Sequence, residues 1–143
     1  MKPIAIIFVS IIILGKVLLD DGADDPRYFK QKGYFKDDSL NRIVSVELLK
    51  SQYSRSEVVK WAERTPNTPG QITQVYFYQR GGVIPSDGLT VDATSVLDAQ
   101  EMLWETRGLS KWRYAYVTMI NGSTQFIECE ADPSNDFCRT KQS

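Results

Sequence analysis

The longest uninterrupted run of hydrophobic positions lies at the start of the chain. Between Pro3 and Leu19 only Ser10 and Lys16 carry a polar or charged side chain. A helix over this run would be about 25 Å long, close to the roughly 30 Å of a bilayer's hydrocarbon core. The pattern therefore predicts that residues 1–19 form a membrane anchor, with Lys16 reaching back to the headgroups.

A secretory signal peptide would begin in the same way, and the difference lies at the cleavage site. Signal peptidase requires small residues ahead of the cut, and neither the junction after Gly15 nor the one after Ala23 provides them. We therefore expect the segment to remain on the mature chain. Its removal after export, and its burial as the terminal helix of a soluble protein, are the alternatives.

An acidic stretch separates the predicted anchor from the rest of the chain. Residues 20–26 read DDGADDP, and like charges combined with Gly and Pro favour a solvated linker. The remaining residues, 27–143, have the size of one domain.

Shorter hydrophobic patterns predict an α+β fold for this domain. Branched and aromatic residues favour strands at 42–49, 72–80, 112–120 and 123–130. The first of these could instead be a helix capped by Ser39. With two helices between the strands, the expected order is β-α-β-α-β-β.

The two helices are predicted from their ends and their apolar stripes. Ser54-Arg55-Ser56-Glu57 fits a capping box, and Thr65-Pro66 ends the helix that it begins. The second helix is expected from about Thr94 to Arg107, with Gly108 as its C-terminal cap. Its buried stripe would consist of Val96, Leu97, Gln100, Leu103 and Trp104.

The last two strands flank Asn121-Gly122, the dipeptide favoured in two-residue type I′ hairpins. Such a turn would set the register of the C-terminal antiparallel hairpin. The expected cross-strand pairs are Val117 with Phe126, Tyr116 with Ile127, and Tyr114 with Cys129.

Charge and composition narrow the functional classes. Seventeen Lys and Arg oppose eighteen Asp and Glu, so the chain lacks the basic excess of a nucleic-acid-binding domain. It contains no histidine, which removes the commonest general base and metal ligand. No nucleophile or phosphate-binding motif occurs, and the carboxylates Glu101 and Glu105, one helical turn apart, fit a solvated face. We therefore expect no cofactor, no metal and no catalytic residues.

The two cysteines, Cys129 and Cys138, lie near the end of the last strand. The intervening EADPSNDF contains turn-forming residues that could bring the thiols together, so we expect a disulfide if the domain is exported. The same stretch matches only the first alternate positions of a calcium loop, and Phe137 stands where that loop requires Gly.

The segment following the linker is the candidate contact surface, because basic and aromatic residues alternate there without an acid. It could lie on lipid or recognise an acidic protein. Alternatively, Phe29, Tyr34 and Phe35 could pack a first helix onto the domain. The candidate partner-binding residues are Arg27, Tyr28, Lys30, Lys32, Tyr34, Phe35 and Lys36.

These features together predict a single-pass membrane protein whose domain is a non-enzymatic binding or assembly module of a cell envelope. The Lys and Arg count beside the anchor would keep the domain in the cytoplasm, but the short basic start favours export to the periplasm or the cell exterior. The expected partners are membrane lipid through residues 1–19 and a protein in or at the membrane. A small exported inhibitor of a toxin or hydrolase, and a carboxylate-dependent hydrolase, are the alternatives.

Overall fold

The structure, a computed structural model, describes residues 27–138. The predicted anchor and the acidic linker lie outside these residues. Among the residues described, no helix is both long enough and hydrophobic enough to cross a membrane.

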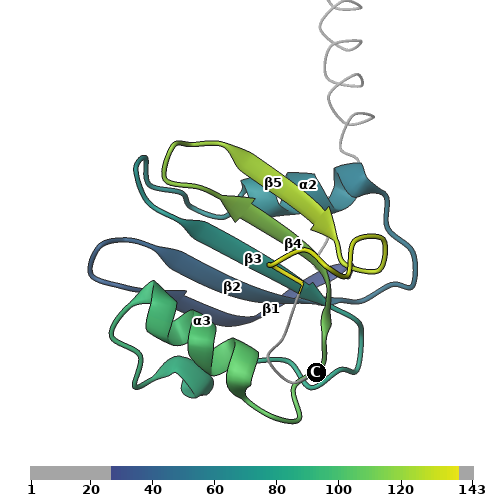
Figure 1. Cartoon of the computed structure of the whole chain (residues 1–143). Coiled ribbons are helices and arrows are strands. Elements are labelled where there is room, and N and C mark those ends of the chain that lie inside the picture. The colour runs from purple at the N-terminus through teal and green to yellow at the C-terminus, as the bar shows by residue number, and fades with distance from the viewer. Residues whose placement is uncertain (1–26, 139–143) are drawn as a thin grey trace, which may run out of the picture.

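Five strands form one mixed sheet (Figure 1). The strands are β1 (Phe29–Lys36), β2 (Arg42–Leu48), β3 (Thr73–Tyr78), β4 (Trp112–Thr118) and β5 (Thr124–Glu128), and the helices are α2 (Arg55–Glu63), the 3-10 helix η1 (Asp87–Thr90) and α3 (Val96–Glu105). The strands lie side by side in chain order. β2 and β3 are parallel, and each other neighbouring pair is antiparallel. The α+β class is confirmed, with one more strand than the sequence predicted.

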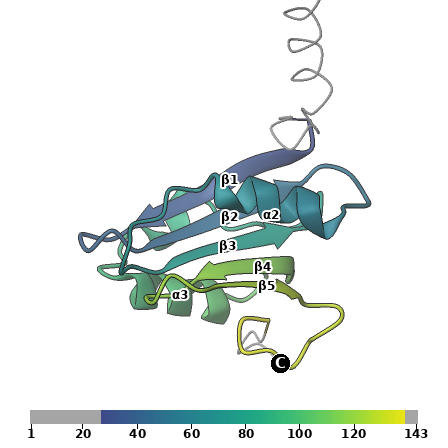
Figure 2. The same cartoon turned by 90° about the horizontal axis from the view of Figure 1, so that it is seen from above.

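The two α-helices of the described residues cover opposite faces of the sheet (Figures 1 and 2). Val58 and Ala62 of α2 share a core with Phe77 of β3, whereas Leu103 of α3 shares a second core with Tyr76. Because both faces are covered, all six residues of β3 are buried. The aromatic residues of β3 and β4 therefore build the two cores.

The local signals for α2 are confirmed. The side chain of Ser54 accepts a hydrogen bond from the backbone N–H of Glu57, and the Glu57 carboxylate accepts one from the N–H of Ser54. This reciprocal pair satisfies two N–H groups that have no partner inside the helix. The strands predicted at 42–49 and 72–80 are also present, as β2 and β3.

The segment that could have packed as a first helix is the edge strand β1, so that alternative is wrong. Phe29 is buried in the α2-side core and pairs with Leu48, whereas Phe35 packs against the α3-side core and pairs with Ile43. A strand with a bulge between residues 31 and 33 can serve both faces, which one side of a helix cannot. Lysines along an edge strand also discourage pairing with other chains.

The C-terminal hairpin is present, but its predicted register is wrong by one residue. Tyr116 pairs with Phe126 and Ala115 with Ile127. The loop has three residues, since the N–H of Met119 donates to the carbonyl of Ser123, and Gly122 has φ +82°. This is the geometry of a type I turn followed by a glycine bulge. The register keeps each paired set on one face, and a slip of one residue would reverse the faces of β5.

The stripe predicted for α3 is partly wrong. Val96 and Leu103 are buried, but Leu97 is 65% exposed and Ala99 is fully buried in its place. A small residue at 99 lets the helix approach the large aromatic side chains of the sheet. The helix ends at Glu105, so Gly108 belongs to the turn after it.

Two contacts connect β1 and the turn after it to the segment that leads into α3 and to the first residue of that helix. A Cβ added at Gly33 would lie 2.7 Å from the backbone oxygen of Pro85, so only glycine fits there. In the turn between β1 and β2, the Asp37 carboxylate accepts the N–H groups of Asn41 and of Val96. Burial alone would raise the pKa of Asp37, but these hydrogen bonds outweigh it and hold the pKa below its usual value.

Candidate functional site: a basic groove at the carboxyl ends of β2 and β3

At the carboxyl ends of β2 and β3, the connections that follow the two strands leave toward opposite faces of the sheet. After β2 the chain turns to the α2 face, and after β3 it turns to the α3 face. The two carboxyl ends therefore lie side by side while their connections separate. In open sheets with parallel strands, such a divergence is where ligands bind.

A groove occupies this position, with a volume of about 520 Å³. That volume lies within the range of small-ligand sites. Among the described residues, its lining contains three cationic side chains and no carboxylate. The lining residues are Leu48, Leu49, Lys50, Ser51, Gln79, Arg80 and Arg113, which we call the basic groove.

Arg113, the second residue of β4, joins the walls of the basic groove. Its Nη1 donates to the backbone oxygen of Ser51 over 3.1 Å, and its guanidinium lies 5.0 Å from the centre of the Tyr114 ring. The Nε of Arg113 is buried, and no described residue accepts its hydrogen. Arg113 is therefore held in place while some of its five donors stay available.

Lys50 is held at the opposite wall by aromatic rings and one carboxylate. Its Nζ lies 4.8 Å from the ring centres of both Tyr28 and Tyr53 and forms an ion pair with Glu57. Burial alone would raise the pKa of Glu57, but the bonds from Lys50 and from the N–H of Ser54 outweigh it and lower the pKa. Because Glu57 balances Lys50, the excess positive charge of the groove comes from the two arginines.

Arg80 supplies the accessible charge. It follows the end of β3 and is exposed, and within residues 27–138 its guanidinium forms no hydrogen bond or ion pair. An arginine presents a planar set of donors that matches a carboxylate or a phosphate. The groove can thus offer charge-assisted hydrogen bonds to an anionic group.

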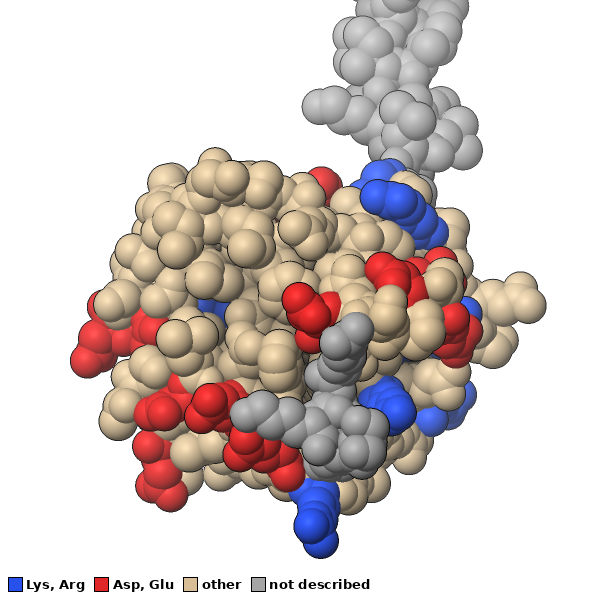
Figure 3. All heavy atoms as spheres, in the orientation of Figure 1, with Lys and Arg blue, Asp and Glu red and all other residues tan. Residues whose placement is uncertain are grey.

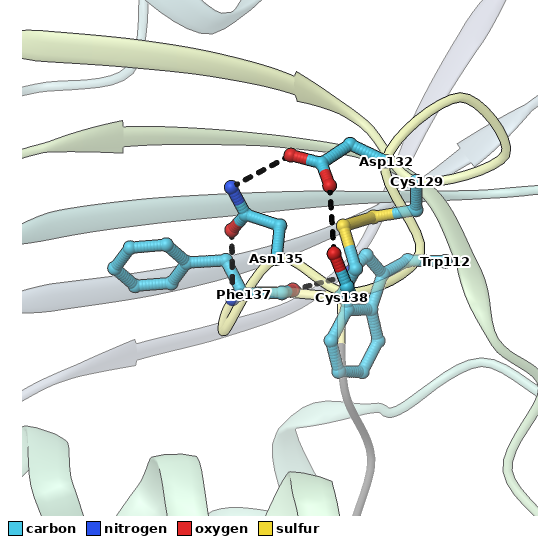
Figure 4. The surroundings of a disulfide bond; sticks show 7 residues. Trp112, Cys129, Asp132, Asn135, Phe137 and Cys138 are labelled. Carbon is cyan, nitrogen blue, oxygen red and sulfur yellow. Dashed lines mark hydrogen bonds between the residues drawn. A yellow bond between two sulfur atoms is a disulfide. The ribbon is translucent and has the colours of Figure 1, made fainter.

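A second cavity of about 280 Å³ adjoins the basic groove and shares Gln79 and Arg113 with it. The disulfide expected from the sequence forms one of its walls, with the sulfurs of Cys129 and Cys138 2.03 Å apart. Figure 4 shows the indole of Trp112 donating to the backbone oxygen of Phe137, over 2.7 Å. The disulfide loop therefore shapes this end of the sheet.

The acidic turn inside the disulfide loop is bonded within itself. Asp132 accepts hydrogen bonds from the side chains of Ser134 and Asn135. Across the described part of the chain, no three Cys, Asp or Glu residues are grouped so that they could hold a metal ion.

The structure spreads the seven residues of the predicted contact surface along β1 and the two residues before it. An eight-residue strand is about 26 Å long, so these residues do not form one patch. Arg27 and Tyr28 lie at the end near the basic groove, where the Tyr28 ring contacts Lys50. Lys36 is exposed at the far end of the strand.

The middle of β1 is taken up by structural contacts. Lys32 forms a 3.4 Å ion pair with Glu47, and Lys30 lies opposite Glu47 in the ladder. The hydroxyl of Tyr34 accepts a hydrogen bond from Nε of Arg42. Glu47 also accepts the N–H of Gly81, and chiefly for that reason its pKa is lowered.

Sequence reasoning missed Lys50, Arg80 and Arg113, which are up to 63 positions apart. Each stands at an end of a strand that the sequence did predict. Their proximity requires β2 and β3 to be parallel neighbours, and no local pattern indicates that arrangement. The sequence feature that could have indicated this site is a cationic residue at an end of each of three predicted strands.

Charge is unevenly distributed over the surface. In Figure 3 most of the visible Lys and Arg atoms lie along the right-hand side, at the end of the sheet where Figure 1 places the start of β4. The charged atoms visible at the lower left, over α3, are those of Asp and Glu. Asp and Glu atoms lie among these cations on the right-hand side as well, so both charge signs are present at this end of the domain.

In comparisons with known proteins, no family model, curated protein or solved structure matches this chain.

Proposed function

We propose that this chain is a membrane-anchored, non-enzymatic binding or assembly module, exposed outside the membrane, and that its basic groove binds an acidic segment of a protein partner. The groove carries the proposal, because the described residues that line it include two arginines and no carboxylate. The apolar start of the chain supports the anchor, and the disulfide suits an oxidising compartment.

A binding experiment with an acidic probe tests the groove. The full chain in neutral detergent is titrated into a fluorescein-labelled hexa-aspartate peptide, and binding is followed by anisotropy at low and raised salt. Arg80→Gln removes one charge-assisted interaction and should weaken binding about tenfold. Lys36→Gln removes the same charge at the far end of β1 and should leave the affinity unchanged.

Two results would contradict the proposal. Equal affinities for the Arg80→Gln and Lys36→Gln proteins would show that the groove is not the site. An intact mass for the mature chain that begins near Lys16 or Asp24 would remove the anchor and favour a secreted inhibitor.

A further inference from the structure

Resting on the proposed function, we propose that the acidic residues 20–25 of the same chain occupy the basic groove when no partner is bound. A partner's acidic segment then binds by displacing them. Three observations carry this inference: where the chain enters the domain, how far the acidic residues can reach, and how little acid the groove itself contains.

The chain enters the domain beside the basic groove. The backbone oxygen of Tyr28 accepts the N–H of Leu49, a lining residue, over 2.9 Å, and it also accepts the hydroxyl of Tyr53. The ring of Tyr28 lies 4.8 Å from Nζ of Lys50. The described part of the chain therefore starts next to the rim of the groove.

The acidic residues are within reach of the groove by chain length. Asp24 and Asp25 precede Tyr28 by four and three positions, a span of at most about 14 Å. Asp20 and Asp21 can extend to roughly 25 Å from it. Four carboxylates can thus approach Arg80 and Arg113 without any rearrangement of the described domain.

Charge complementarity and covalent tethering favour binding of residues 20–25 over binding of an untethered acidic peptide. Residues 20–26 contain four Asp and no cation, and no carboxylate occurs among the residues of 27–138 that line the basic groove. A short tether gives a bound segment an effective concentration on the order of millimolar. A competing partner must therefore carry several carboxylates in succession, which defines its chemistry as an acidic, extended peptide.

Displacement also changes the reach of the domain. While residues 20–25 lie in the groove, the domain stays close to the predicted anchor. Once they are released, these six residues can span up to about 20 Å. Binding of the partner would then also allow the domain to move away from the membrane.

The test compares full-length proteins in neutral detergent with the hexa-aspartate probe. Asparagine replaces Asp20, Asp21, Asp24 and Asp25 together in the linker variant. Its affinity for the probe should be about tenfold higher than that of the wild type, because the internal competitor is lost. Adding Arg80→Gln to this variant should remove most of the gain.

A matched control separates competition from net charge. It neutralises four exposed acids outside the linker whose carboxylates form no hydrogen bond or ion pair with a described residue, namely Asp38, Glu63, Asp92 and Glu101. Its affinity for the probe should stay within about twofold of the wild type, since long-range charge is screened at physiological salt.

Each outcome is decisive. If the linker variant binds like the wild type, or no tighter than the control, while Arg80→Gln still weakens binding, the linker proposal is overturned and the groove remains a site. If Arg80→Gln has no effect in either background, the proposed function fails. Carbodiimide cross-links from Lys50 or Lys111 to residues 20–25, lost with excess peptide and absent from Lys36, would support the linker proposal directly.

Discussion

Replacing Cys129 and Cys138 together by alanine should lower the free energy of unfolding by about 2 to 3 kcal/mol without unfolding the sheet. The two residues are nine positions apart. Closing a loop of this size removes about 2.7 kcal/mol of chain entropy from the unfolded state. For a domain of this size that loss corresponds to roughly 10 °C in Tm.

The structural effect should be local. The disulfide holds the loop whose Phe137 carbonyl accepts the indole N–H of Trp112. In the alanine variant this hydrogen bond should open more often, so the indole proton of Trp112 should exchange faster with solvent. Strands β2 and β3, which the loop does not cross, should keep their amide protection.

Urea unfolding of the full chain in neutral detergent measures the stability change, and hydrogen exchange by NMR measures the local opening. A reductant should bring the wild type to the stability of the alanine variant and leave that variant unchanged. A stability difference below about 0.5 kcal/mol, or a variant that still responds to reductant, would refute the loop-entropy reasoning.

Three further substitutions test the fold. Ser54→Ala should destabilise by about 1 kcal/mol, because the helix loses its cap, while Ser54→Gly should cost only a few tenths; equal urea midpoints for wild type and Ala would contradict this. Gly33→Ala should cost about 1 to 3 kcal/mol, because its Cβ meets the Pro85 backbone, whereas Gly88→Ala, with open space around it, serves as the control. Asp37→Asn should lower stability by about 1 kcal/mol at neutral pH. The folded pKa of Asp37 is depressed, so its contribution is present above the unfolded pKa of about 4 and is lost as the pH falls; the two urea midpoints should converge in acid, and parallel pH profiles would refute this.

Short-range patterns predicted the elements that depend on neighbouring residues. The capping box at Ser54 needs only four consecutive residues, because its hydrogen bonds close within one helical turn. The pairing of Cys129 with Cys138 follows because the chain has two cysteines and a turn between them. The hairpin around Asn121-Gly122 was likewise predicted as an element.

Features that depend on both faces of the sheet were mispredicted. The hairpin register is set by which residues of β5 face α2 and which face α3, and a dipeptide does not encode that choice. β1 lacks a regular alternation because its bulge shifts the pattern midway and its edge is exposed. Helical periodicity predicted that Leu97 is buried. In the structure Ala99 is buried instead, because its small side chain lets α3 pack closely against the aromatic residues of the sheet.

The sequence by itself determined where most strands and helices begin and end, because backbone preference and capping act over a few residues. Tertiary structure alone decided that β2 and β3 are parallel neighbours and that their connections leave to opposite faces. That topology brings Lys50, Arg80 and Arg113 to one groove. These three cationic residues, far apart in the chain, lie together because of the order of the strands in the sheet. That order depends on the burial of both faces of the sheet, which is a property of the whole fold.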